Sequence, residues 1–178
     1  KDYGLASCYN GLPIGGGAYT LSRLRLNRIA EKAASLEDFF NKALPEAVDT
    51  LCAFMDAKID YLVNKTPFFK SNFLIKEGFI KKERFVGLFG IVGLNECVNT
   101  LMEMQGKTER YGYTDEANEL GIRIMDAIDA RVKKHKNEHC YFWNNNFLLH
   151  AQVGIEEDYE ISPGARIAIG NELPLYEH

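Results

Sequence analysis

Cys8 is the residue of this sequence whose surroundings best suit chemistry. It stands in the stretch LASCYNGLPIGGG (residues 5–17), close to the turn dipeptide Asn10-Gly11 and just before a triplet of glycines. Glycine adopts backbone conformations closed to other residues and lets another chain or a ligand approach closely. A cysteine on such a loop is presented to its surroundings, which favours a reactive thiol. A flexible surface loop that happens to hold a cysteine is the alternative interpretation.

Two histidines could act as a base for that thiol. Cys8 with His139 or His150 would make a thiolate–imidazole nucleophile, but nothing in the sequence places them together. His139 also fits a solvated position at the end of a helix, and His150 a half-buried one. The other cysteines have apolar neighbours and are expected to pack as small hydrophobic side chains: Cys52, Cys97 and Cys140.

Acidic and amide side chains next to tight glycine turns are the candidate substrate-binding groups. Glu96 follows the glycine-rich run 87–93, Asn171 and Glu172 follow Gly170, and Asn10 adjoins the Cys8 loop. A favourable interaction with a helix N-terminus would also account for Glu96. The glycine runs match neither a P-loop nor the GxGxxG fingerprint, and no CxxC or close Cys/His cluster predicts a metal site.

Length and composition limit the class of protein. The 178 residues suit a single domain, and 46% hydrophobic and 26% charged residues are ordinary values for a globular chain. A net charge of -4 argues against a nucleic-acid or acidic-membrane partner. No segment is long and apolar enough to span a bilayer, and no signal peptide opens the chain, so reduced thiols in the cytoplasm are expected.

Hydrophobic spacing predicts alternating strands and helices. The expected strands cover residues 18–27, 84–93, 140–145 and 164–170, and the expected helices cover residues 36–64, 94–105 and 114–136. A capping box begins the first helix, which Pro45 could bend. Alternation along the first strand puts Tyr19, Leu21, Arg23 and Arg25 on one face. Because neither face is cleanly polar, we expect this strand to be covered on both sides within an α/β fold.

The order of these segments resembles one family. A lone cysteine on a loop and a glycine patch are followed by YTLSRLRLNRIA, FVGLFGIVGLNECVN, WNNNFLLHAQ and GARIAIGNELPLYEH. This order is similar to the later part of the catalytic barrel of glycyl radical enzymes. The resemblance is closest to the YjjI family and runs through nearly the whole chain. Anaerobic ribonucleotide reductases are more distantly similar.

The resemblance implies a fold and a mechanism. It implies that residues 1–178 form one domain, the second part of a ten-stranded α/β barrel, and that Cys8 is the finger-loop cysteine. A stable glycyl radical would take hydrogen from that cysteine, and the thiyl radical would abstract hydrogen from a small-molecule substrate. An activase with S-adenosylmethionine and an iron–sulfur cluster would install the radical, so this chain itself would bind no cofactor.

The family's radical glycine, in a pattern like Arg-Val-x-Gly-Tyr, is not found in this sequence. The segment 110–113 is one residue short of the pattern, and the segment 166–171 is one residue too long. We therefore expect a fragment of a longer protein whose other segments complete the barrel and supply the radical glycine. Two alternatives stay open: a thiol-dependent enzyme with Cys8 as an ionic nucleophile, and a non-enzymatic α/β binding module.

Overall fold

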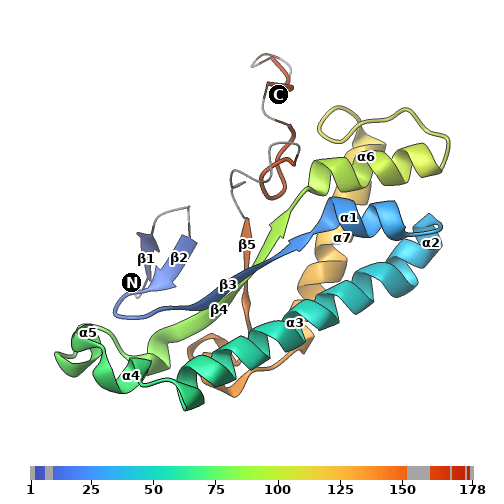
Figure 1. Cartoon of the computed structure of the whole chain (residues 1–178). Coiled ribbons are helices and arrows are strands. Elements are labelled where there is room, and N and C mark those ends of the chain that lie inside the picture. Colours follow the sequence, from blue (N-terminus) through green and yellow to red (C-terminus); the bar gives the residue numbers. More distant parts are fainter. Residues whose placement is uncertain (1–2, 7–9, 152–160, 169, 175, 177–178) are drawn as a thin grey trace.

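The chain has a mixed α/β fold with a parallel sheet. The computed structural model describes residues 3–6, 10–151, 161–168, 170–174 and 176, and for residues 3–6, 10 and 11 it describes the backbone alone. Strands β1 (Tyr3–Ala6) and β2 (Asn10–Pro13) form an antiparallel pair. Strands β3 (Gly17–Arg25), β4 (Phe85–Val92) and β5 (Leu148–Ala151) form a three-stranded parallel sheet in that order (Figure 1).

Helical segments occupy most of the chain between the strands. In chain order they are α1 (Leu26–Lys32), α2 (Leu36–Asp38), η2 (Phe39–Ala43), α3 (Leu44–Asp60), η3 (Tyr61–Lys65), α4 (Phe68–Ser71), α5 (Phe73–Lys76), η4 (Lys82–Arg84), α6 (Leu94–Met104), α7 (Asp115–Lys134) and η5 (Glu138–Trp143). The predicted helices 36–64, 94–105 and 114–136 are confirmed, with small differences at their ends.

The helix predicted for residues 36–64 is continuous but not uniform. It begins where the Ser35 hydroxyl accepts a hydrogen bond from the Asp38 N–H at 3.0 Å, which is the predicted cap. Its turns are π-helical over η2 and η3 and α-helical between them. Pro45 lies at the start of α3, directly after η2, where a local change of hydrogen-bond spacing accommodates a residue without an N–H.

The main core lies between this sheet and helices α1, α3, α6 and α7. Every residue of β4 is buried, as its unbroken apolar run indicates. Phe85, Phe89 and Ile91 join the core cluster, together with Leu24 of β3 and, partly buried, Leu149 of β5. Position 87 has no room for a side chain, because a Cβ there would lie 2.5 Å from the ring of Phe147. Close packing therefore explains this glycine.

The prediction that Tyr19 shares a face with Leu21 and the two arginines is wrong, because β3 contains a β-bulge at Tyr19. The β3–β4 register shifts between Ala18 and Thr20, so Tyr19 is an extra residue in β3. Its ring packs in the core against Phe69 and Phe85, and its hydroxyl donates to the carbonyl of Lys82 at 3.1 Å. Leu21, Arg23 and Arg25 keep the predicted alternation.

Two expected strands are wrong. Residues 140–145 form the end of a 3₁₀ helix, η5, and a turn in which Asn144 and Asn145 have φ of 58° and 61°. The strand of this region is β5, which begins at Leu148. In the expected strand 164–170, the described residues form turns and irregular structure, with Gly164 at φ 52°. Local turn chemistry outweighs the β-propensity of both segments.

Candidate functional site

The predicted reactive loop lies at the end of the β1–β2 hairpin. Ala6 pairs with Asn10, and the chain between them, residues 7–9, includes Cys8 and lies outside the described residues. Asn10 is described by its backbone alone, as the first residue of β2. The structure therefore describes the two strands that flank Cys8 in the sequence. In Figure 1 the hairpin and helix α3 lie on opposite sides of strand β3.

The glycine triplet brings this hairpin to the parallel sheet. Gly16 N–H donates to the Pro13 carbonyl at 2.9 Å, which closes the turn between β2 and β3. Gly15 has φ +72°, and a Cβ on Gly16 would lie 2.1 Å from the Arg84 carbonyl oxygen. No other residue type would allow the chain to pass so close to the start of β4. The triplet thus positions the hairpin, and a phosphate need not be invoked.

The sheet face that points away from the helical core carries the basic side chains of β3. We call it the arginine face. Residues at matching positions of parallel strands point to the same side, so the register defines its members. They are Ala18, Leu21, Arg23, Arg25, Val86, Leu88, Gly90, Val92, Leu148 and His150.

One row of this face joins three strands. Arg23 of β3 pairs with Gly90 of β4, which pairs with His150 of β5. A Cβ on Gly90 would lie 3.1 Å from the Arg23 Cβ and 3.0 Å from the Ser22 carbonyl. Gly90 therefore lets β3 and β4 approach closely and places no side chain between Arg23 and His150. His150 is 5% exposed, so it is buried and not half-buried as expected.

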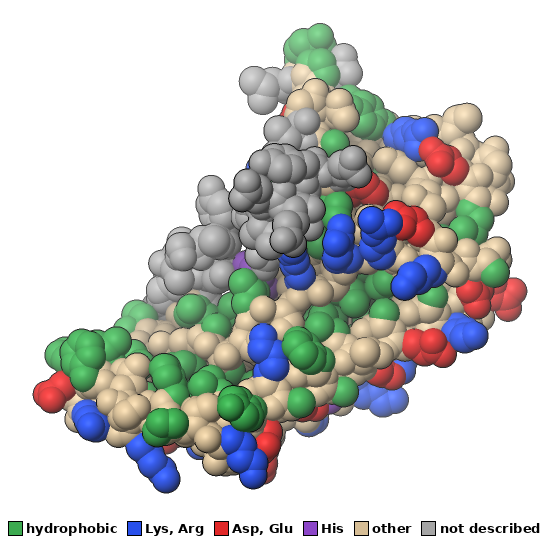
Figure 2. Space-filling model, in the orientation of Figure 1, with side chains coloured by type: hydrophobic (Ala, Val, Ile, Leu, Met, Phe, Trp, Pro, Cys, Tyr) green, Lys and Arg blue, Asp and Glu red, His purple; other side chains and the backbone are tan. Residues whose placement is uncertain are grey.

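The ionisable side chains among the described residues of the arginine face are all basic. Among its described residues, two arginines and a histidine stand beside apolar side chains and a glycine, with no acidic residue. Figure 2 shows Lys and Arg side chains gathered where β3 runs into α1, with hydrophobic and acidic side chains beside them. Such a surface favours anions over cations.

Glu96 lies at the carboxyl edge of the sheet, in the first turn of α6. Gly93, with φ +76°, turns the chain from β4 into this helix. Glu96 Oε1 accepts hydrogen bonds from the Ser162 N–H at 3.1 Å and from the Ser162 hydroxyl. The Gly93 N–H donates to the Ser162 carbonyl at 3.0 Å. The carboxylate predicted to bind substrate thus holds residues 161–164 against the edge where open α/β sheets bind ligands.

Two further predicted residues are exposed on the C-terminal segment. The Glu172 carboxylate accepts from the Gly170 N–H at 2.8 Å, and the Asn171 carbonyl accepts from the Tyr113 hydroxyl. Neither contact connects them with Glu96. Asn27, which we did not predict, lies closer to that edge: its side chain is 7% exposed, and its Oδ1 would lie 3.2 Å from a Cβ on Gly93.

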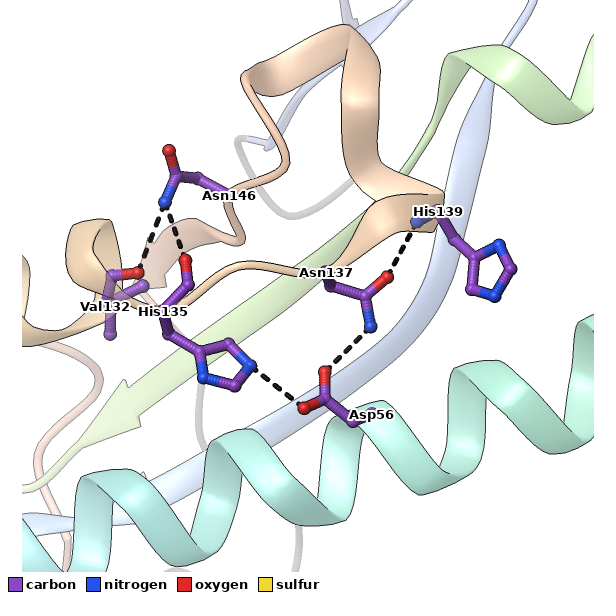
Figure 3. A network of polar contacts seen from close by, with 6 residues as sticks. All are labelled: Asp56, Val132, His135, Asn137, His139 and Asn146. Atoms are coloured by element: carbon purple, nitrogen blue, oxygen red, sulfur yellow. Dashed lines mark hydrogen bonds and ion pairs between the residues drawn. The ribbon is translucent and has the colours of Figure 1, made fainter.

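His139 lies at the opposite end of the sheet from Glu96. Its backbone N–H donates to Asn137 Oδ1 at 3.0 Å, and its carbonyl accepts from the Tyr19 hydroxyl at 3.1 Å. Figure 3 shows its ring pointing away from a network in which Asp56 of α3 accepts a hydrogen bond from Asn137 and lies beside the ring of His135. The distances are 2.7 Å from Asn137 Nδ2 and 3.0 Å from His135 Nε2. These contacts tie α3 to the connection before η5 and are structural.

The described cysteines are unsuited to nucleophilic catalysis. Cys52, Cys97 and Cys140 are free and buried, as predicted. Burial raises the pKa of Cys52 to about 12 and that of Cys140 to about 11. Burial also raises the pKa of Cys97. Thiols of this kind are protonated at neutral pH and react slowly.

The described residues include neither a grouped set of metal ligands nor a membrane-spanning helix. Within them, no three or more His, Cys, Asp or Glu side chains are grouped as metal ligands. None of the helices described combines the length and apolar character that crossing a bilayer requires.

Sequence reasoning found part of this arrangement. Alternation along β3 predicted that Arg23 and Arg25 share a face, although we assigned them no function. The contact between Glu96 and Ser162 was missed because it joins residues far apart in the chain. Ser162 carries no local signal that could have indicated it.

The chain is similar over its whole length to one family of proteins. The family model for the glycyl radical enzyme YjjI-like family matches residues 1–178. The chain is 45% identical over 176 residues to "Uncharacterized protein YjjI" of Escherichia coli, covering 99% of this chain and 34% of that protein. It is 41% identical over 181 residues to an "Uncharacterized protein" of Haemophilus influenzae, covering 100% of this chain and 35% of that protein.

Solved structures show the same fold at lower identity. The anaerobic ribonucleotide reductase from Thermotoga maritima with citrate in the active site is 21% identical, with a TM-score of 0.59 over 82% of this chain and 26% of that chain. The same enzyme with dATP and CTP gives 20% identity and a TM-score of 0.55 over 75% and 22%. The chain thus spans about a third of the curated relatives' length and about a quarter of these structures.

Proposed function

Because the chain belongs to the YjjI-like glycyl radical enzyme family, we propose that Cys8 carries the thiyl radical of a glycyl radical enzyme. The family match over residues 1–178 is the observation that carries this proposal. Cys8 is proposed to take the family's finger-loop position, as the resemblance of the surrounding segments implies. The β1–β2 hairpin supports the assignment, since a paired hairpin is a suitable carrier for a projecting side chain.

The proposed chemistry consists of two hydrogen-atom transfers. In the first, a glycyl radical takes a hydrogen atom from the Cys8 S–H bond, which restores the glycine and leaves a thiyl radical. In the second, the thiyl radical takes a hydrogen atom from a C–H bond of a small-molecule substrate, which restores the thiol and leaves a substrate radical. Both steps require near contact between the reacting atoms and a site closed to water.

The rest of the site is proposed to come from beyond this chain. Residues 1–178 would be one domain and supply the second part of a ten-stranded barrel, and other segments of the parent chain would complete it and hold the radical glycine. The fold shared with anaerobic ribonucleotide reductases supports the barrel. An activase with S-adenosylmethionine and an iron–sulfur cluster would install the radical, in a cytoplasm free of oxygen.

The four residues predicted to bind substrate have different proposed roles. Asn10 adjoins the hairpin loop and keeps its proposed role beside Cys8. Glu96 shapes the carboxyl edge through Ser162, so we propose that it positions this wall of the site. Asn171 and Glu172 would contact substrate only if the C-terminal segment closes over the same edge.

Electron paramagnetic resonance of the full-length protein tests this function. After incubation with its activase and S-adenosylmethionine without oxygen, we expect a glycyl radical signal, and we expect none when the activase is left out. A protein that gives no such signal with an activase of proven activity would exclude radical chemistry. Catalysis by Cys8 as an ionic nucleophile would then be the next hypothesis to test.

A further inference from the structure

We propose that Arg23 and Arg25, with His150 across Gly90, bind an anionic group of the substrate, a carboxylate or a phosphate. This inference rests on the proposed function because it assumes that the arginine face lines the substrate chamber. It adds the chemical class of the substrate, which family membership does not supply.

The placement of the arginines is the first argument. Arg23 and Arg25 are two residues apart on β3 and point to the same side of the sheet. Both are partly exposed, whereas Val86 and Val92 on the same face are fully buried. Guanidinium groups are suited to carboxylate and phosphate because their N–H donors form paired hydrogen bonds with two oxygens.

Gly90 is the second argument. It lies directly between Arg23 and His150 in the row across the sheet and, as a glycine, places no side chain between them. An imidazole N–H is a further donor to an anionic oxygen. A ligand group lying over Gly90 would therefore meet donors from β3 on one side and from β5 on the other.

The surrounding charge is the third argument. The described members of the arginine face include no carboxylate that would repel an anion. Arg23, Arg25 and His150 each also interact with another group of the chain. A side chain that is already held in place loses less conformational freedom when a ligand binds. These interactions are compatible with a prearranged anion site.

Calorimetric titration of the full-length protein tests the inference. Inorganic phosphate and malonate serve as separate probes, so the result also identifies which anionic group the site takes. We expect the wild type to bind at least one probe and Arg23→Gln and Arg25→Gln each to bind it about tenfold to hundredfold more weakly, as the loss of a charged hydrogen bond implies. Arg28→Gln is the matched control, because Arg28 lies on α1 and pairs with Glu31 at 2.8 Å.

The wild type provides a second readout that does not depend on variants folding. The bound anion should slow the modification of Arg23 and Arg25 by phenylglyoxal and leave that of Arg28 unchanged. Failure of the wild type to bind either probe, or equal modification with and without the anion, would overturn the inference. A glycyl radical signal in the same preparation tests the proposed function separately, since anion binding requires no radical.

Discussion

Arg23 and His150 lie on either side of Gly90 in one row across the parallel sheet, although 127 positions separate them in the numbering. The three strands that carry them are parallel, so the row is at the same height in each strand. A helical core covers the other face of the sheet. This relationship gives the sheet one face that packs in the core and one face that carries the row of basic side chains.

The close contact between β3 and β4 at Gly90 can be tested by adding a methyl group there. In Gly90→Ala the new Cβ would lie 3.0 Å from the Ser22 carbonyl, so the strands must shift slightly. We expect the free energy of unfolding to fall by about 1–3 kcal/mol, as for other overpacked positions. Thermal unfolding of the full-length protein measures this. Leu21→Ala on the same face should cost less, because Leu21 is 43% exposed; the opposite ranking would contradict the described register.

The Asp56 network can be compared with a simple surface pair. Asp56→Ala removes the acceptor for Asn137 and the carboxylate that lies 3.0 Å from His135 Nε2, and we expect a loss of about 1–3 kcal/mol of stability. Asp129→Ala removes one partner of the exposed Lys133 pair and should cost only about 0.5 kcal/mol. The two aspartates are equally exposed, at 38%. Equal losses in a denaturation experiment would show that the network adds no stability.

The role of Glu96 predicts a change in protease sensitivity. Glu96→Ala removes the acceptor that binds the N–H and hydroxyl of Ser162, so the segment that follows should be held less firmly. We expect trypsin to cleave after Arg166 faster than in the wild type, as followed by mass spectrometry. Glu103→Ala is the control, because Glu103 pairs with Arg110 on an exposed surface. Unchanged cleavage in Glu96→Ala would argue for a direct substrate contact instead.

Cysteine alkylation separates packed thiols from an accessible one. The pKa of Cys52 is raised to about 12 and that of Cys140 to about 11, so almost no thiolate is present at pH 8. Deprotonation, and with it alkylation, increases only as the pH rises toward these values. We expect iodoacetamide to modify Cys52, Cys97 and Cys140 only after denaturation, as read by peptide mass spectrometry. Rapid modification of any of them in the native protein would contradict their described burial.

Most of the fold follows from local sequence, whereas most of the site does not. The buried run of β4 and the capped helix from Leu36 were predictable because their patterns are local. The segment 140–145 was misjudged because its aromatic residues favour a strand, while capping by Asn137 and left-handed Asn144 produce a 3₁₀ helix and a turn. The row from Arg23 to His150 depends on the pairing of β4 with β5, which no local pattern specifies.

The central claim is that Cys8 exchanges hydrogen atoms with the radical glycine, and the most direct measurement is the glycyl radical spectrum in D₂O. Reversible transfer from a deuterated Cys8 thiol would replace the glycine hydrogen by deuterium, so the doublet splitting from that hydrogen should collapse in the wild-type full-length protein. In Cys8→Ser we expect the radical to form and the doublet to persist. Equal collapse in both proteins, or an unchanged doublet in the wild type, would contradict the account.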